Sequence, residues 1–157
     1  MFITIAYIGN SNSKLNELER DYIKKINRIG NTLGLKEIIL KKIKNSPKKN
    51  ITDRKEDEFS RLSNIICRDS FNILLDRKGI QLDSINFSKI ILKESSNSKN
   101  LIFFIGGSDG VEKKNHKHFD KILSFGDLTW PHKMFRVMLL EQIYRSITIF
   151  NNHPYHK

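Results

Sequence analysis

The chain has 157 residues, 38% of them hydrophobic and 29% charged, which suits one soluble globular domain that folds without disulfides or structural metals. Its single cysteine excludes an intrachain disulfide and a multi-cysteine zinc site, and no apolar run approaches the ~20 residues of a membrane span, so we expect a cytoplasmic protein with no membrane partner. The formal charge of +11 favours a polyanionic partner, nucleic acid before an anionic membrane surface, unless the lysines merely reflect an AT-rich genome.

The N-terminal half alternates strand and helix patterns. Residues 2–8 and 35–43 predict strands, and between them apolar residues recur at helical spacing. These apolar residues are Leu15, Leu18, Tyr22, Ile23 and Ile26, with Ser13 as the expected N-cap. Residues 45–52 predict a mobile surface loop, followed by a helix from about Asp53. Cys67 lies among apolar residues and is expected to be a buried, inert thiol.

The C-terminal half continues the alternation. Residues 71–75, 101–105 and 122–125 predict strands, and the second of these is the most apolar, so we place it centrally in the sheet. Helices are predicted from Asp83, around residues 113–119, and from Pro131 to about Phe150. Strands separated by helices predict an α/β fold with a mainly parallel sheet flanked by helices.

Three segments leave the carboxyl ends of these strands, where open parallel sheets bind ligands. They are residues 75–79, 106–110 and 125–130. In the second segment Gly106 and Gly107 allow close approach of backbone to a ligand, or simply allow a strand-to-helix turn with positive φ. Their spacing to Gly110 matches neither the dinucleotide fingerprint nor the phosphate loop.

Titratable residues cluster in the last quarter of the chain. His132 and Arg136 are four residues apart at the start of a helix and can share a face that relays protons and binds anions; the alternative is an exposed helix N-terminus. In the tail, Tyr155 could stack on a base and Lys157 could meet phosphate, or the tail could be frayed. The histidines lack the spacing of a metal site, and no Gly-x-Ser-x-Gly elbow supports a hydrolase.

Taken together and in this order, these segments resemble the RlmH (YbeA-like) family of SPOUT α/β-knot methyltransferases, over the whole chain. The N-terminal half matches mainly in pattern, with Lys55 and Glu58 as the family-like positions. The matching motifs are Leu75-Asp76-x-x-Gly79, Ile105-Gly106-Gly107-x-x-Gly110, Leu123-Ser124 through Pro131-His132, Arg136-Val137, Glu141-Gln142-x-Tyr144-Arg145 and Asn152-His153-Pro154-Tyr155-His156.

The resemblance implies one SPOUT domain over residues 1–157 with a C-terminal trefoil knot, a homodimer, and S-adenosylmethionine as methyl donor. The implied acceptor is N3 of a pseudouridine in the intersubunit stem-loop of large-subunit (23S) ribosomal RNA, on assembled ribosomes. Family cofactor contacts map onto Leu75, Gly106, Phe125, Gly126, Asp127, Leu128, Thr129 and Trp130, and the closing tail maps onto Tyr155 and His156.

The chemistry sets the expected residue roles. A protonated imide nitrogen is a weak nucleophile, so a base or an anion-stabilising group should assist. We expect the tail and the His132–Arg136 face to converge on the base, with Arg136 stabilising negative charge and His156 or His132 assisting proton removal. We expect RNA docking by Lys41, Lys42, Lys44, Lys48 and Lys49.

Two alternatives stay open at this point. One is a non-catalytic RNA-binding factor for ribosome assembly, which shares the basic charge and needs no cofactor pocket. The other is a related SPOUT enzyme with a different target, such as transfer RNA.

Overall fold

The computed structural model describes residues 1–9, 17–97 and 99–156, which form a five-stranded sheet between two layers of helices. The strands are β1 (Phe2–Gly9), β2 (Glu37–Lys44), β3 (Ser70–Gln81), β4 (Asn100–Ile105) and β5 (Lys121–Ser124). Their order is β2-β1-β4-β3-β5, and every neighbouring pair is parallel. The parallel α/β fold and the central place of residues 101–105 are therefore confirmed, whereas the trefoil knot stays a prediction.

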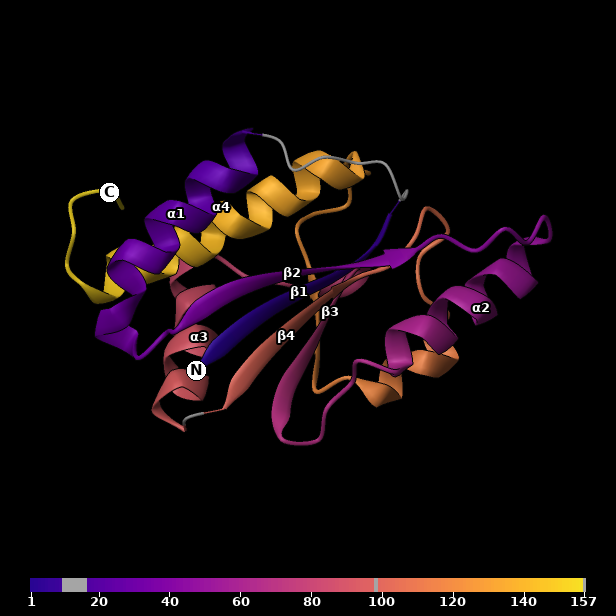
Figure 1. Cartoon of the computed structure of the whole chain (residues 1–157), viewed down its shortest axis with the longest axis horizontal. Coiled ribbons are helices and arrows are strands. Elements are labelled where there is room, and N and C mark those ends of the chain that lie inside the picture. The colour runs from indigo at the N-terminus through magenta and orange to yellow at the C-terminus, as the bar shows by residue number, and fades with distance from the viewer. Residues whose placement is uncertain (10–16, 98, 157) are drawn as a thin grey trace.

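Helices cover both faces of the sheet (Figure 1). On one face lie α1 (Glu17–Ile29), α3 (Ser84–Ser96) and α4 (His132–Phe150), whose apolar residues pack with β-strand residues in the larger core cluster. On the other face lie α2 (Ile51–Ser63) and the 3₁₀ helix η2 (Lys113–His118), next to a smaller cluster around Phe104 and Phe119. A short 3₁₀ helix, η1 (Gly30–Leu33), links α1 to β2. With both faces covered, ligands have access mainly at the strand ends.

Strand β3 is longer than the predicted strand of residues 71–75. It continues to Gln81, and its pairing with β5 shifts register between Leu75 and Ile80. Residues 76–79 are therefore an irregularity within the strand and not a loop after it. Gly79 makes this possible, because a Cβ there would lie 2.6 Å from the backbone carbonyl carbon of Leu123.

Other predictions in the N-terminal half were wrong in detail. Cys67 is exposed and lies in the connection after α2, which ends at Ser63, so it is not on the apolar face of a helix. Leu18 is 58% exposed, off the apolar face of α1. Helix α2 begins at Ile51, earlier than expected, because the Asn50 side chain accepts hydrogen bonds from the N–H groups of Thr52 and Asp53. The predicted N-cap Ser13 and Leu15 lie outside the described residues.

Candidate functional site

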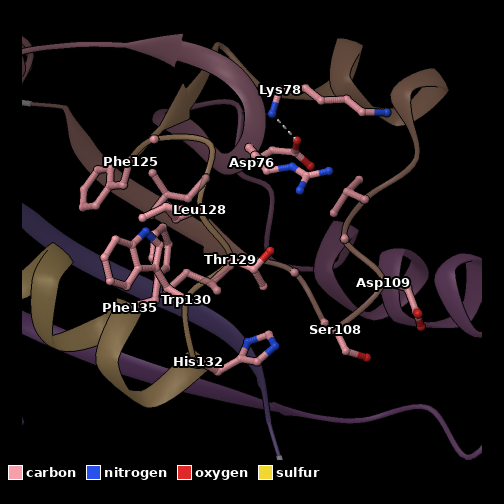
Figure 2. Close-up of a pocket in the computed structure, with 18 of the residues that line it drawn as sticks. Asp76, Lys78, Ser108, Asp109, Phe125, Leu128, Thr129, Trp130, His132 and Phe135 are labelled. Carbon is pink, nitrogen blue, oxygen red and sulfur yellow. Dashed lines mark hydrogen bonds between the residues drawn. The ribbon is translucent and has the colours of Figure 1, made fainter.

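A pocket of about 400 Å³ lies at the carboxyl ends of β4 and β5 and at the irregularity of β3 (Figure 2). The three segments predicted from the sequence meet there, as expected for a parallel sheet. The lining residues are Lys55, Leu75–Lys78, Ile105–Val111, Phe125, Gly126, Leu128, Thr129, Trp130, His132 and Phe135. Of the eight residues that the resemblance assigned to the cofactor, all but the exposed Asp127 line this pocket.

The glycine turn forms the floor of the pocket. Gly106 is buried at the end of β4, and the turn closes through a 3.0 Å hydrogen bond from the N–H of Gly110 to the carbonyl of Gly107. A Cβ on Gly107 would collide with the carboxylate of Glu58, which packs beneath the turn from α2. The Glu58 Oε1 accepts a hydrogen bond from the Ser46 N–H. The Glu58 Oε2 is buried and has no hydrogen-bond partner among the described residues. A larger residue at position 107 would therefore have to displace the buried Glu58 carboxylate.

One wall of the pocket is aromatic. The rings of Phe125 and Phe135 lie 5.2 Å apart, and Figure 2 shows the Trp130 indole beside them. The Trp130 Nε1 is buried and has no hydrogen-bond partner among the described residues. Such a wall suits the face of a heterocyclic ring, and the indole N–H is a donor available to a ligand. Phe135 was missed by the sequence analysis, although it lies one turn after His132 on the same face.

The opposite side of the pocket is charged. The Asp76 Oδ1 accepts the Lys78 N–H at 2.8 Å (Figure 2), and the His116 Nε2 lies 3.8 Å from the Asp76 Oδ2. Lys55, Arg77 and Lys78 contribute cations to the lining. Lys55 was indicated by its family-like position, and Arg77 and Lys78 only by their place inside the motif of residues 75–79, because basic residues are frequent throughout this sequence.

His132 is the histidine of the pocket lining. Burial lowers its pKa, and the nearby Arg136 cation lowers it further, while the Glu58 carboxylate acts in the opposite direction. The imidazole is therefore neutral at neutral pH. A neutral imidazole in a pocket can accept a proton.

Arg136, four residues later, does not line the pocket. Its side chain is buried, its Nε donates to the Glu19 Oε1 at 2.7 Å, and its guanidinium lies 4.1 Å from the centre of the Tyr7 ring. The charge of Arg136 is therefore engaged within the protein, between α4, α1 and β1. A partner 117 positions away in the chain leaves no local signal in the sequence.

The C-terminal tail lies along the other end of α4. The Tyr155 hydroxyl donates to the Glu141 Oε1 at 3.2 Å, and the Arg145 Nη1 lies 3.4 Å from the His156 Nδ1. Burial, Tyr22 and Glu141 raise the pKa of Tyr155 to about 12, so it is a neutral phenol. At ~1.5 Å per helical residue, Arg145 is roughly 20 Å along α4 from His132. Within one chain, then, the tail and His132 are not brought together.

A second, apolar groove of about 730 Å³ lies next to the pocket and shares Phe125 and Gly126 with it. It runs between α3, α4 and the end of β3, and the 60%-exposed Ile80 is part of its edge. Its other apolar lining residues are Tyr22, Leu82, Phe87, Leu123, Val137 and Met138. Most of the exposed surface of the groove is apolar, although Gln81, Asp83, Ser84, Ser124, Glu141 and Gln142 also line it, so it suits a protein surface better than a charged ligand.

In the described part of the chain, no helix is both long and apolar enough to cross a membrane. No three histidine, cysteine or acidic side chains gather there in a way that could hold a metal ion.

Comparison with known proteins gives consistent results. Residues 1–156 match the profile of a protein family described as "Predicted SPOUT methyltransferase". The "Ribosomal RNA large subunit methyltransferase H" of Mycoplasmopsis agalactiae is 41% identical over 99% of this chain and 98% of its own, and that of Malacoplasma penetrans is 39% identical over 100% of both. Among solved structures, the SpoU methyltransferase AviRb from Streptomyces viridochromogenes in complex with AdoMet matches with a TM-score of 0.42 at 10% identity, over 92% of this chain and 57% of that longer chain.

Proposed function

This chain belongs to the SPOUT methyltransferase family, enzymes that take their methyl group from S-adenosylmethionine, and we propose that it methylates N3 of a pseudouridine in large-subunit ribosomal RNA. The names of the similar proteins support the ribosomal RNA target. The observation that carries the proposal is the pocket itself, where three segments distant in sequence meet at the strand ends. Following the resemblance to the RlmH family, we propose the intersubunit stem-loop of assembled ribosomes as the substrate.

The pocket fits S-adenosylmethionine. A purine ring suits the wall of Phe125, Trp130 and Phe135, and the glycine turn lines the pocket with backbone that a ligand can approach closely. The unpartnered Trp130 Nε1 offers a donor to the ligand. The proposed holders are Leu75, Gly106, Phe125, Gly126, Leu128, Thr129 and Trp130, with Asp127 at the rim. When bound, the cofactor supplies a sulfonium methyl group to a nucleophilic nitrogen.

The residues of the chain would then orient the base and manage its proton. Alignment of donor and acceptor supplies most of the acceleration in such a displacement. His132, neutral at neutral pH, is proposed to accept the N3 proton of the pseudouridine. Arg136 is paired with Glu19 and is proposed to act by holding the first turns of α4, and therefore His132, in place. The field of its cation would also favour an anionic base.

The proposed assembly is a homodimer in which the tail acts on the pocket of the partner. Tyr155 and His156 lie at the end of α4 remote from their own pocket, so they could close over a base only in another chain. The apolar groove beside Phe125 and the exposed Ile80 and Met134 supply surface that a second copy would bury. Sedimentation equilibrium tests this: a monomer at micromolar concentration would contradict the proposal.

The methylation itself is tested in cells that lack the protein. Large-subunit RNA from these cells should lack one methylpseudouridine by mass spectrometry, and the purified protein with S-adenosylmethionine should restore it. If the modification persists, or if transfer RNA loses a methyl group instead, the proposed target is wrong. A thermal shift with the cofactor separates the enzyme from a non-catalytic assembly factor, because a ligand that binds only the native state raises its stability.

A further inference from the structure

The loop between β2 and α2 is rich in lysine and is held firmly. This lysine loop, residues 45–50 together with Lys44 at the end of β2, exposes Lys44, Lys48 and Lys49. Arg61 of α2 donates from Nη1 to the carbonyls of Lys44 and Asn45, at 2.9 and 3.1 Å. The sequence predicted a mobile loop, whereas its backbone is bound by side chains of α2.

A buried serine completes the attachment. The Ser46 N–H donates to the Glu58 Oε1 at 3.2 Å, and the Ser46 Oγ accepts the Lys48 N–H at 3.2 Å. Hydrogen bonding to Ser46 lowers the pKa of Asp57, so this carboxyl group stays ionised beneath the lysines. Since Glu58 also packs under Gly107, the loop and the pocket floor share one support.

Arg54 joins the lysine loop directly to the pocket. Its Nη1 donates to the carbonyls of Lys48 and Lys49, at 3.2 and 3.3 Å, while its Nε donates to the Asp109 Oδ2 at 2.5 Å. Asp109 belongs to the glycine turn and lines the pocket; in Figure 2 its carboxylate points toward α2. The pair raises the pKa of Arg54 and lowers that of Asp109, so both remain charged across the physiological range.

A loop whose hydrogen bonds hold three exposed lysines near one another needs a reason, because like charges held together repel. A polyanion removes this repulsion, and RNA phosphates beside a methyltransferase pocket are the natural partner. Arg54 links the loop to the glycine turn, so phosphates that favour this position of the loop also favour this position of Arg54 and, through Asp109, of the turn. Two ligands that favour the same arrangement of shared residues bind cooperatively.

We propose that the lysine loop docks phosphates of the RNA substrate and that Arg54 is a positioning residue which couples this docking to cofactor binding at the glycine turn. The coupling rests on the proposed function, in which the pocket binds S-adenosylmethionine. It predicts that RNA and cofactor each raise the affinity for the other.

The test measures the dissociation constant of S-adenosylhomocysteine, an analogue without a transferable methyl group, by equilibrium dialysis with and without large ribosomal subunits. We expect subunits to tighten binding to the unaltered protein about fivefold or more. For each variant we compare the ratio of its dissociation constants without and with subunits. A variant that binds the analogue more weakly under both conditions therefore keeps its ratio. In Arg54→Gln and in Asp109→Asn this ratio should fall to about 1, and the double variant should lose nothing further.

Arg61→Gln is the matched control. Among the described residues, Arg61 bonds to carbonyls of the same loop and to Asp57 but not to the glycine turn, so its variant should keep the ratio. In Lys48→Gln/Lys49→Gln, subunit binding should weaken, and the slope of log affinity against log salt should become shallower by up to ~2.

A ratio retained in Arg54→Gln, or a ratio near 1 in the unaltered protein, would overturn the coupling. Unchanged subunit binding in the double lysine variant would overturn the docking. If the analogue does not bind the unaltered protein at all, the cofactor pocket itself is refuted.

Discussion

Arg136 and Glu19 form an ion pair of 2.7 Å in the interior, with 4% and 0% of their side-chain surfaces exposed. The pair connects the first turns of α4 to α1, and the guanidinium also covers the Tyr7 ring. His132 lies one turn earlier on α4, so the orientation of this proposed base depends on a contact that lies outside the pocket. A residue of this kind can affect both stability and rate without touching substrate.

The first prediction concerns this pair. Arg136→Met should lower the free energy of unfolding by about 3–5 kcal/mol, because it removes the cation that faces a buried carboxylate. Glu19→Met/Arg136→Met should recover part of the loss, and urea denaturation of the four proteins gives the coupling energy. Arg145→Met is the comparison on the same helix: its pair with Glu141 is partly exposed, and its loss should cost roughly 0.5 kcal/mol.

Methylation by Arg136→Met separates positioning from direct contact. If Arg136 acts through α4, then Glu19→Met should slow methylation as well, although Glu19 does not line the pocket. A rate lost in Arg136→Met but unchanged in Glu19→Met would instead support the expectation that Arg136 stabilises the charge of the base.

Much of the architecture could be predicted because it depends on local pattern. The run of apolar residues 101–105 indicated a central strand, and the predicted strands alone located the three segments at their carboxyl ends, which include most of the pocket lining. What failed depends on tertiary contacts. The extension of β3 requires Gly79 to meet the backbone of Leu123, and the link from the lysine loop to the glycine turn requires Arg54 to reach Asp109, 55 positions away.

The lowered pKa of His132 predicts how the methylation rate depends on pH. Burial holds its pKa below the ordinary 6.5, so the neutral base persists to more acidic pH and methylation should fall only below pH 6.5. In Glu58→Gln the pKa of His132 should fall further, because the Glu58 carboxylate favours the protonated imidazole. The acidic limb of the profile of methylation rate against pH should then move to lower pH. In His132→Gln this acidic limb should vanish. NMR titration of the imidazole in the unaltered and Glu58→Gln proteins checks the direction, and an upward shift would contradict it.

The lowered pKa of His132 also makes the free energy of unfolding depend on pH in a defined direction. Because the folded pKa is lower than the unfolded pKa, the unfolded chain binds more protons below pH 6.5, so this contribution to stability is present above pH 6.5 and is lost as pH falls. His132→Gln should therefore reduce the acid sensitivity of the melting temperature.

Gly79 provides a prediction for the fold. Gly79→Ala should destabilise the protein by about 1–3 kcal/mol, because the added methyl group meets the backbone of Leu123 and not a movable side chain. Gly9→Ala is the control, since its nearest neighbour is the Tyr7 ring at 3.1 Å, a side chain that can shift. Denaturant midpoints of the two variants should differ clearly; equal midpoints would show that the register shift of β3 adapts easily.

The last prediction tests whether the tail acts in the partner. Removal of residues 155–157 should leave the helix end intact, because the His153 N–H still donates to the Thr148 carbonyl, and should leave cofactor binding intact while methylation is lost. Gly106→Leu, whose side chain would press against Val111 and Gly110 and displace the turn that lines the pocket, should lose both cofactor binding and methylation. Circular dichroism and thermal melts check that both variants fold.

Mixed dimers of these two variants then distinguish the arrangements, once purified through two different tags. If each pocket uses the tail of the partner, the truncated chain contributes an intact pocket and the Gly106→Leu chain contributes an intact tail, so one of the two sites is restored. Methylation should therefore return to about half of the unaltered rate, because one of two sites is complete. If each tail served its own pocket, neither site would be whole and the mixed dimer would be as inactive as its parents.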